Sequence, residues 1–348
     1  MSVLLLNAGS TSLKYQVLSD EGIVLKKGGS SRVKDFEQAF KQIIEELRFV
    51  DEIRVVGHRV VHGGDRYCQP TVIDQIVLDY LENITTLAPL HLPFNILGIH
   101  LAMDHWPNLP QIAVFDTAFF AELPAVAKLY ALPKKIAQEN HWHRYGFHGL
   151  SHEFLTQAAA EKLNKKIEQV NLIICHLGGG SSVSAVKLGK AVDISLGWSP
   201  TAGLPMMTRT GDLDPGLLLE IIEKTPGQTS DEKIKTVRQL LNKESGLLGL
   251  SGYDDFLDIL TARKKGEQAA KEAFDYYIYR IINFIGAYFA VLGGQVDAVV
   301  LSGAIGFGSL DLQAAISQKL ASWCSAPIMP LATNEELAML RQIKSLGY

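Results

Sequence analysis

The feature that most constrains how this 348-residue chain can fold is a sequence pattern that occurs twice. The apolar run Val3–Leu6 leads into small polar residues at 7–12, after which apolar residues recur at alternate positions. The same order returns at 172–175 and 176–181. An apolar run, a turn of small residues and a stretch with apolar residues at every second position together predict a β-hairpin. The repetition predicts two similar domains, aligned at Gly9 and Gly178, Ser12 and Ser181, and Val17 and Val186.

Turns built from small residues leave their backbone N–H groups accessible, and phosphate is a natural ligand for such groups. A third glycine-rich turn, Ser302–Gly308, follows an expected strand at 298–301. Open α/β sheets bind ligands where strands end in turns of this kind. We therefore predict an α/β fold of two domains, with one hairpin from each domain holding a polyphosphate in a cleft.

Composition narrows the class of partners. A net charge of −4 and an isoelectric point near 6.2 give no broad positive field, which argues against nucleic acid and anionic membranes. Three distant cysteines, Cys68, Cys175 and Cys324, argue against a disulfide framework and for a reducing compartment. The N-terminal apolar run is too short for a signal peptide, and Asn283 within the apolar stretch 281–294 favours a core helix over a membrane span. We expect a cytoplasmic protein that acts on small molecules.

Capping residues predict where several helices begin. Ser151 is expected to cap a helix that carries Phe154 and Leu155, and Asp214 caps a helix that starts with Pro215. Thr333 and Glu336 have the spacing of a capping box before the last helix, 337–348. This assignment gives Glu336 a structural role and leaves its neighbour Glu335 without one.

Two polar residues follow or interrupt apolar strands. The period-two pattern of 53–61 places Arg59 on one side of a strand with apolar residues, and Asp116 comes directly after the apolar run 112–115. A structural ion pair is the alternative for Arg59, because a buried guanidinium needs a carboxylate or phosphate partner. A turn is the alternative for Asp116.

Two further residues lie in loops. His148 precedes an expected helix, where a packed core histidine is the alternative, and Arg209 could simply pair with Asp212 or Asp214. Walker, nucleophile-elbow and zinc motifs are missing from the sequence. Two arginines, a histidine, an acid and glycine-rich turns are the groups that phosphoryl transfer requires.

Nine blocks in this order resemble the signature blocks of acetate kinases and their propionate and butyrate kinase relatives. They are NAGSTSLKY, GHRVVHGG, APLHLPFN, VFDTAFF, YGFHGLSH, HLGGGSS, TRTGDLDP, SGLLGLSG and ATNEEL. The resemblance implies two duplicated ribonuclease-H-like domains of the actin, sugar-kinase and heat-shock ATPase group, with a nucleotide cleft between them. It implies an N-terminal domain 1–118 completed by helix 337–348, and a C-terminal domain 119–336 with most nucleotide contacts.

The resemblance also implies roles for individual residues. The catalytic set is Arg59, Asp116, His148 and Arg209, with the two arginines on the acyl carboxylate and the transferred phosphoryl group. The acyl substrate is assigned to Arg59, Val61, Leu90, His91, Phe147 and Pro200, and Mg²⁺ or Mn²⁺ to Asn7 and Glu335. ATP or ADP is assigned to Ser12, Lys14, His176, Leu177, Gly178, Gly179, Gly180, Asp255, Phe256, Leu257, Ala304, Ile305, Gly306, Phe307 and Gly308.

Several positions depart from the family pattern. Gly179 and Leu92 stand where asparagine is usual, Leu150 replaces threonine and Phe120 replaces histidine. The nucleoside-binding Asp-x-Arg is represented by Asp255-Phe256-Leu257, and the Gly-Ile-Gly-Glu-Asn turn by residues 304–308. The chain is also shorter than most members, which indicates trimmed loops. The departures are concentrated at the adenosine end of the expected site.

The resemblance therefore implies reversible, Mg²⁺-dependent phosphoryl transfer from ATP to acetate, giving acetyl phosphate and ADP, by a homodimer. Propionate or butyrate kinase activity is the nearest alternative, because one methylene in a pocket changes binding by only about 1 to 3 kcal/mol. A nucleotide-binding regulatory protein with impaired catalysis is the alternative from another class, and Leu257 and Phe307 motivate it.

Overall fold

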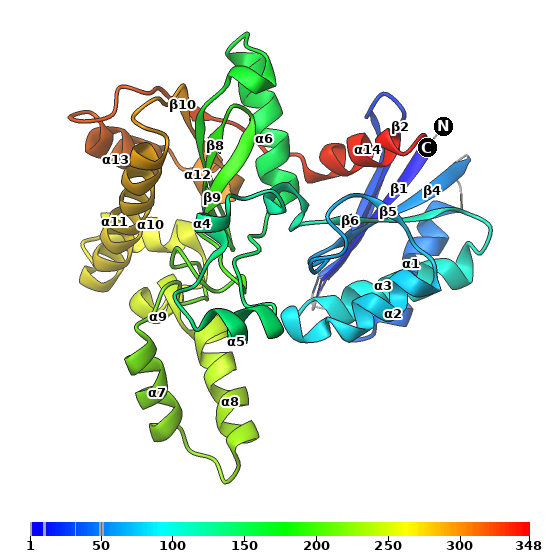
Figure 1. Cartoon of the computed structure of the whole chain (residues 1–348), viewed down its shortest axis with the longest axis horizontal. Helices are drawn as coiled ribbons and strands as arrows, with labels where there is room; N and C mark the ends of the chain where they lie inside the picture. The colour runs from blue at the N-terminus through cyan, green and yellow to red at the C-terminus, as the bar shows by residue number, and fades with distance from the viewer. Residues whose placement is uncertain (1, 10–11, 32, 49, 51) are drawn as a thin grey trace. The chain divides into compact units, whose positions relative to one another are not determined.

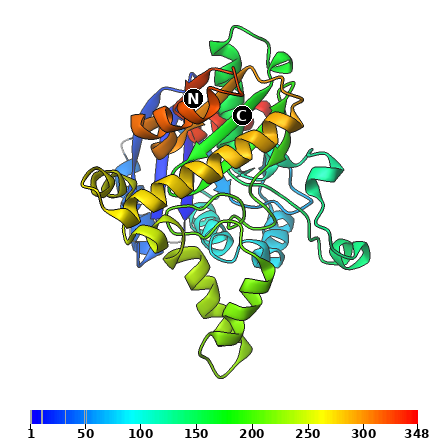
Figure 2. The same ribbon diagram turned by 90° about the vertical axis from the view of Figure 1, so that its left-hand side faces the viewer.

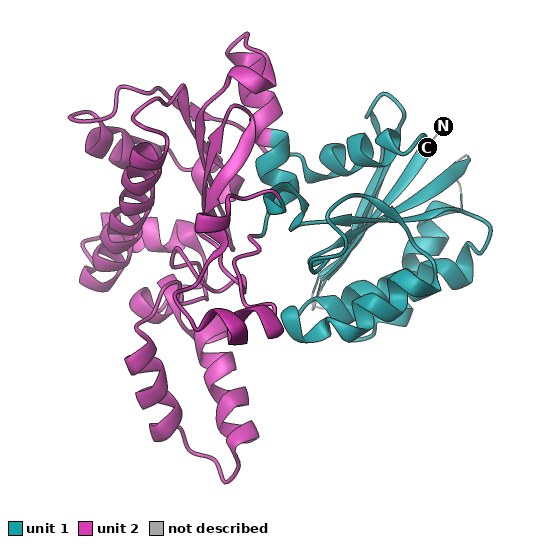
Figure 3. Cartoon of the chain, viewed as in Figure 1, with its two compact units in different colours: residues 1–121, 147–154, 334–348 teal, residues 122–146, 155–333 magenta. Residues whose placement is uncertain are grey.

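The computed structural model describes residues 2–9, 12–31, 33–48, 50 and 52–348. The chain forms two compact units (Figure 3). Unit 1 comprises Met1–Ala121, Phe147–Phe154 and Asn334–Tyr348, and unit 2 comprises Glu122–Gly146 and Leu155–Thr333. Compared with the expected C-terminal domain 119–336, residues 119–121, 147–154 and 334–336 fall in unit 1 instead.

The described part of unit 1 contains one six-stranded sheet in the order β3-β2-β1-β4-β6-β5. The strands β1, β2 and β3 are antiparallel neighbours, whereas β1, β4 and β6 are parallel. The short strand β5 pairs antiparallel with β6 at the edge. The bounds are β1 Ser2–Gly9, β2 Ser12–Ser19, β3 Val24–Ser31, β4 Ile53–Val60, β5 Thr71–Val72 and β6 Gln111–Phe115.

Helices cover both faces of the unit 1 sheet because both faces are apolar (Figure 1). On β1, Leu4, Leu6 and Ala8 join the core beneath α1 and α3, whereas Val3 and Leu5 pack against α14. This alternation is the period-two pattern of a strand that is buried on both sides. The helices of unit 1 are α1 Phe36–Leu47, α2 Gln75–Asn83, α3 Leu92–His105 and α14 Glu335–Ser345, with short 3₁₀ turns η1 Thr85–Leu87 and η2 Ala118–Phe120.

The described part of unit 2 repeats this topology. Its five strands have the order β11-β10-β7-β8-β9, in which β7, β8 and β9 are antiparallel neighbours and β7, β10 and β11 are parallel. The order matches β6-β4-β1-β2-β3 of unit 1, so the predicted duplicated α/β fold is confirmed. The bounds are β7 Leu172–Leu177, β8 Ser181–Lys187, β9 Lys190–Ile194, β10 Ala298–Ser302 and β11 Ile328–Pro330.

The core of unit 2 is organised by the long helix α11, Gln268–Val291, which lies across the sheet (Figure 2). Its residues Ile281 and Ile285 are fully buried, which confirms the predicted core helix. Among the described residues, no helix combines the length and the hydropathy that a membrane crossing requires. Helix α6, Gly149–Lys162, begins in unit 1 and continues into unit 2. The other elements are α4 Ala125–Lys128, α5 Lys134–Glu139, η3 Ile167–Gln169, α7 Pro215–Lys224, α8 Ser230–Gln239, η4 Leu240–Glu244, α9 Gly246–Ser251, α10 Phe256–Lys264, α12 Gly303–Gly308 and α13 Leu310–Leu320.

The small-residue turns are shorter than predicted. Strands β1 and β2 continue to Gly9 and Ser12, which are register partners, so most of the expected turn at 7–12 is strand, and Ser10 and Thr11 lie outside the described residues. In unit 2, residues 176–177 belong to β7. The expected turn at 302–308 is wrong, because Gly303–Gly308 forms the short helix α12.

One of the three predicted helix starts is confirmed. Asp214 caps α7, accepting a hydrogen bond from Leu217 N–H at 3.0 Å. Ser151 is not a cap, because α6 already begins at Gly149. The last helix begins at Glu335, and its cap is Asn334, which accepts from Leu337 N–H at 2.9 Å in place of the predicted capping box. Asparagine is as good a cap as threonine, and it lies one residue nearer the helix.

Candidate functional site

Polar side chains in unit 1 gather where the parallel strands β1, β4 and β6 end. On β1 the residues that face α14 are Val3, Leu5 and then Asn7, and on β4 they are Val55, Gly57 and Arg59. Asp116 follows β6 directly, as predicted. Because the carboxyl ends of parallel strands meet at one edge of a sheet, these residues come together although they are far apart in sequence.

Arg59 is held by two carboxylates. Its Nε donates to both carboxylate oxygens of Asp116 at 3.1 Å, and its Nη2 donates to Oδ2 at 2.7 Å. On the other side, Nη1 lies 3.3 Å from Oε2 of Glu335. The Asp116 side chain is only 3% exposed, whereas those of Arg59 and Glu335 are 20% and 19% exposed. The pair with Asp116 therefore forms a fixed base, and the contact with Glu335 lies at the accessible side.

Burial and charge act in opposite directions on this group. Burial alone lowers the pKa of Arg59, but the negative charges of Asp116 and Glu335 outweigh it and hold that pKa above its usual range. Burial raises the pKa of Asp116, and the positive charge of Arg59 opposes that shift. A planar guanidinium that uses one edge for a buried carboxylate keeps the rest of its donors for a second anion.

A small cavity of about 20 Å³ adjoins this pair. It brings together four residues that the family resemblance assigned to the site, Asn7, Lys14, Arg59 and Glu335. Asn7 and Lys14 are register partners on β1 and β2. The remaining lining residues are Leu5, Leu6, Tyr15, Gln16, Glu336 and Met339. The volume suits a water molecule or a small ion with polar partners.

The oxygen donors at this cavity fit a magnesium ion. Across the residues that the structure describes, no three His, Cys, Asp or Glu side chains converge as a metal site of their own. The amide of Asn7 and the carboxylate of Glu335 nevertheless line the same cavity. Mg²⁺ at nucleotide sites is commonly held by one or two protein oxygens, with waters and phosphates as its other ligands. These two residues match that donor set.

His148 is brought beside Asp116 by the backbone. Gly149 N–H donates to the Asp116 carbonyl at 2.7 Å, and a Cβ at position 149 would lie only 2.3 Å from that oxygen. His148 itself has a φ of 64°, a conformation that few residues other than glycine adopt. Non-glycine residues with this backbone are concentrated at functional sites.

The residues predicted for the acyl group divide between the units. In unit 1, Val61 directly follows β4, Leu90 is 37% exposed, His91 precedes α3, and Phe147 is buried. The Phe147 ring lies 5.6 Å from the ring of His62, a buried residue that was not among the predicted site residues. Pro200 belongs to unit 2, where its carbonyl accepts a hydrogen bond from Arg209 Nη1 at 3.2 Å.

Arg209 differs from Arg59 in its partners. The sequence left open a pair with Asp212 or Asp214, but Asp212 pairs with Arg280 at 3.0 Å and Asp214 caps α7. Among the described residues no carboxylate forms an ion pair with Arg209. Burial lowers its pKa from the ordinary arginine value. This cation is therefore partly buried without a countercharge.

The glycine hairpin of unit 2 adjoins the Arg209 loop. Gly178 N–H donates to the Gly180 carbonyl at 3.0 Å, and the Gly179 carbonyl accepts from Met207 N–H at 3.3 Å. A Cβ at Gly179 would meet nothing within 4 Å. Position 179 therefore faces open space, and its lack of a side chain is not explained by packing within the described residues.

Helix α12 packs against the same hairpin. Gly303, with a φ of 76°, allows its backbone to approach Leu177, because a Cβ there would lie 2.4 Å from the Leu177 carbonyl oxygen. Ile305 and Phe256 are buried in the core of unit 2. By contrast, Phe307 and Leu257 are 49% and 67% exposed. Asp255 caps α10 through a 2.7 Å hydrogen bond from Leu257 N–H.

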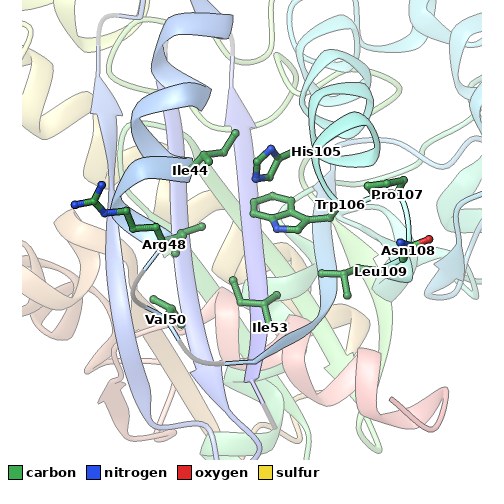
Figure 4. A pocket seen from close by; sticks show the side chains of 10 residues that line it. Ile44, Arg48, Val50, Ile53, His105, Trp106, Pro107, Asn108 and Leu109 are labelled. Carbon is green, nitrogen blue, oxygen red and sulfur yellow. The ribbon is translucent and has the colours of Figure 1, made fainter.

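A larger cavity of about 630 Å³ lies at the other end of the unit 1 sheet (Figure 4). It is lined by Ile53, where β4 begins, by Leu109 just before β6, and by Trp106 and His105 at the end of α3. None of the residues predicted for the site lines it.

Asn95 is a residue that sequence reasoning missed. It lies on α3, is 3% exposed and bonds to the backbone at Ala8 and Val61. A signal for it was present, because Asn95 is a polar residue in the otherwise apolar stretch 92–99. Buried amides in such a position usually bond to the backbone.

Known proteins resemble this chain over most of its length. A family model described as the acetokinase family matches residues 23–326. A protein of Clostridium novyi named acetate kinase is 36% identical over 400 aligned positions, which cover 99% of this chain and 98% of that protein. The aligned length exceeds the 348 residues of this chain, so the relative contains segments that this chain lacks.

Two solved structures resemble the whole chain. The acetate kinase of Porphyromonas gingivalis has a TM-score of 0.90 at 31% identity and covers 100% of both chains. A propionate kinase from Francisella tularensis has the same TM-score and identity and covers 98% of each chain. The two structures are named for different acyl substrates, so overall similarity does not separate acetate from propionate.

Proposed function

Because the chain belongs to the acetokinase family, we propose that it transfers a phosphoryl group reversibly between ATP and acetate, forming acetyl phosphate and ADP. The observation that carries the proposal is Arg59, fixed by three hydrogen bonds to Asp116 and partly accessible beside a small polar cavity. A rigid guanidinium of this kind binds a carboxylate in a defined orientation.

Acetate is the nucleophile in this reaction. One carboxylate oxygen forms a bond to the γ-phosphorus while the bond from that phosphorus to the bridging oxygen breaks, and ADP leaves with the electron pair. Because a carboxylate has no proton to lose, the step needs no general base. Arg59 orients acetate, and Asp116 keeps the guanidinium in place.

Charge on the transferred group must be neutralised as it moves. We assign this role to Arg209 and His148. Arg209 has no carboxylate partner among the described residues, so its charge is available to an anion. The acyl methyl group is assigned to Val61, Leu90, Phe147 and Pro200.

Asn7 and Glu335 would hold Mg²⁺ or Mn²⁺, which would neutralise charge on the phosphate oxygens when bound. Glu335 is also the residue that contacts the accessible side of Arg59. The two roles compete for one carboxylate. If Glu335 bound the metal ion, Nη1 of Arg59 would be available to the substrate.

The nucleotide is assigned to residues of both hairpins. Ser12 and Lys14 belong to the hairpin of unit 1, and 176–180 to that of unit 2. Residues 304–308 adjoin the unit 2 hairpin, and 255–257 begin α10. The exposed side chains of Leu257 and Phe307 give this region an apolar surface.

We also propose a homodimer. Unit 2 exposes the apolar side chains of Val126, Leu129, Leu132 and Ile136 within one short segment. Clustered exposed apolar groups of this kind are typical of interfaces. Light scattering after gel filtration should give about twice the 38.2 kDa mass of the chain. A mass of one chain at micromolar concentration would contradict the dimer.

The activity is tested by trapping the acyl phosphate with hydroxylamine while acetate, propionate and butyrate are varied separately. We expect the highest kcat/KM for acetate, with propionate lower by about 10- to 200-fold at most, the range that one methylene allows. A preference for propionate or butyrate would assign the chain to that substrate. Nucleotide binding without acyl phosphate from any of the three acids would favour the regulatory alternative.

A further inference from the structure

The backbone ladder between β1 and β4 stops short of the candidate site. Its last register pair is Leu6 with His58, so the strand ends that carry Asn7 and Arg59 extend beyond the ladder. In open α/β sheets, ligands bind in the crevice outside the carboxyl ends of the strands. Something other than the ladder has to set the width of this gap.

The side chain of Asn95 bridges the gap. Its Oδ1 accepts a hydrogen bond from Val61 N–H at 3.0 Å, and its Nδ2 donates to the Ala8 carbonyl at 2.6 Å. The amide thus replaces, between the two strand ends, the backbone hydrogen bonds that the ladder no longer supplies. Asn95 is buried, so water does not compete for either bond.

Asn95 acts from behind the candidate site. Ala8 faces the core beneath α3, whereas Asn7 lines the cavity on the α14 face. One turn further along α3, Gly98 lets the helix approach the strand, because a Cβ there would lie 2.9 Å from the Cβ of Ala8. The close packing of α3 on β1 therefore fixes the distance of the Asn95 amide from the strand ends.

We propose that Asn95 is a positioning residue for the phosphoryl transfer. Both bonds are made at or beside assigned groups: Ala8 adjoins Asn7, and Val61, itself assigned to the acyl methyl group, lies two residues beyond Arg59. Asn95 sets the separation of the metal donor and the acyl-binding arginine without touching substrate. The inference rests on the proposed function.

The test uses two substitutions in the full-length chain. Asn95→Ala removes both bonds, whereas Asn95→Asp keeps the acceptor for Val61 N–H and places an oxygen against the Ala8 carbonyl. We expect Asn95→Ala to lower kcat for acetate by about 100-fold, the effect of a displacement near 1 Å, with a raised Mg²⁺ requirement. Asn95→Asp should raise the Mg²⁺ concentration needed for half-maximal activity more than it raises the KM for acetate, because only the bond to the Ala8 carbonyl is lost.

Gln111→Ala is the matched control. Gln111 is also a buried amide of the unit 1 sheet, and it bonds to His58 at 2.8 Å and to the Trp106 and Leu109 carbonyls at 3.3 Å. It lies where β6 begins, at the end of the sheet away from Asp116. Its loss should lower the melting temperature as much as Asn95→Ala does, but should leave kcat and KM within about threefold.

Hydrogen exchange supplies a readout that is independent of activity. The Val61 amide should exchange faster in Asn95→Ala and remain protected in Asn95→Asp. If both Asn95 variants keep kcat and KM within threefold of an active wild type, the inference is wrong and the proposed function stands. A wild type that forms no acyl phosphate overturns the proposed function itself. Should Asn95→Ala not fold, the Asn95→Asp kinetics decide.

Discussion

The two sheets have the same strand order but different chemistry where the parallel strands end. In unit 1 the ends of β4 and β6 carry Arg59 and Asp116. In unit 2 the corresponding strands β10 and β11 end at Ser302 and Pro330, and the hairpin turn consists of glycines 178–180. The fold thus fixes where the strand ends lie, and the residues at those ends determine what each unit can bind.

The arginines differ in the same way. Arg59 is fixed by three bonds to one carboxylate, whereas Arg209 bonds to a carbonyl and has no carboxylate partner among the described residues. Unit 1 therefore presents a guanidinium in a fixed orientation, a geometry that suits a carboxylate. Unit 2 has a cation without a carboxylate partner among the described residues, and open space beside the backbone of Gly179, a combination that suits phosphate.

The largest effect should come from removing the unit 1 receptor. Arg59→Ala should lower kcat/KM for acetate by about 1,000-fold or more, because the oriented charge is lost. It should also cost about 3 to 5 kcal/mol of stability, since Asp116 loses its buried partner. Arg59→Lys keeps the positive charge but loses the planar guanidinium that can bond to two carboxylates at once. Its kcat/KM and its stability should therefore lie between those of the wild type and Arg59→Ala.

Steady-state kinetics and urea unfolding measure both losses. Arg54→Ala on the same strand is the control, because Arg54 forms an exposed pair with Glu52 and should change neither quantity appreciably. If Arg59→Ala and Arg54→Ala had the same kcat/KM for acetate, Arg59 would not be the group in unit 1 that orients the carboxylate.

Unit 1 should also lose stability in mild acid because of His58. Burial lowers the pKa of His58 to about 4, and its hydrogen bond with Gln111 only partly opposes this shift. Below pH 6.5 the unfolded chain binds a proton that the folded chain does not, so stability falls as pH falls toward 4. Between pH 7 and pH 5 the loss from this group should be about 2 kcal/mol.

Trp106 fluorescence can report on unit 1 alone, because the other three tryptophans, Trp142, Trp198 and Trp323, belong to unit 2. With those three replaced by phenylalanine, urea unfolding is measured at the two pH values with and without His58→Asn. The substitution should reduce the pH dependence. An unchanged dependence would show that His58 is not its source.

A smaller effect is expected at the glycine hairpin of unit 2. Gly179→Ala has room for its methyl group, so stability should be retained. If a phosphate lies close to that backbone, the KM for ATP should rise about tenfold while the KM for acetate stays constant. Gly286→Ala in α11, where a Cβ would also fit, is the control. An unchanged KM for ATP would separate this hairpin from the nucleotide.

The smallest effect concerns the exposed residue Leu257. Leu257→Arg restores the family pattern at a position that is 67% exposed, so the fold should tolerate it. A guanidinium there should lower the KM for ATP by about two- to fivefold, as expected for a cation–π contact with the base. Comparison of ATP with GTP in both proteins measures the effect. An unchanged KM for both ATP and GTP would show that the side chain at position 257 does not contact the nucleotide.

Local signals in the sequence predicted local structure well. The two hairpins, the cap at Asp214 and the position of Asp116 after a strand depend on neighbouring residues, and all four are found. The capping box at Thr333 failed because two adjacent residues could cap the same helix, and Asn334 does so.

Long-range partners could not be read in this way. Arg59 and Asp116 are 57 residues apart, so their pairing depends on the register of β4 against β6. The pair of Arg59 with Glu335 requires α14 to return to the sheet from the far end of the chain, which the resemblance implied but periodicity did not. Asn95 was missed because its two hydrogen-bond partners, Val61 and Ala8, are 34 and 87 residues away in the sequence.

The central claim is that a carboxylate oxygen of acetate attacks the phosphorus directly, oriented by Arg59. The most direct measurement is ³¹P NMR of the products formed from ATP, Mg²⁺ and acetate labelled with ¹⁸O in its carboxylate. We predict an acetyl phosphate signal with the isotope shift of one ¹⁸O bonded to phosphorus, strongly reduced with Arg59→Ala. Acetyl phosphate without ¹⁸O on phosphorus, or ADP formed with free phosphate alone, would contradict the account.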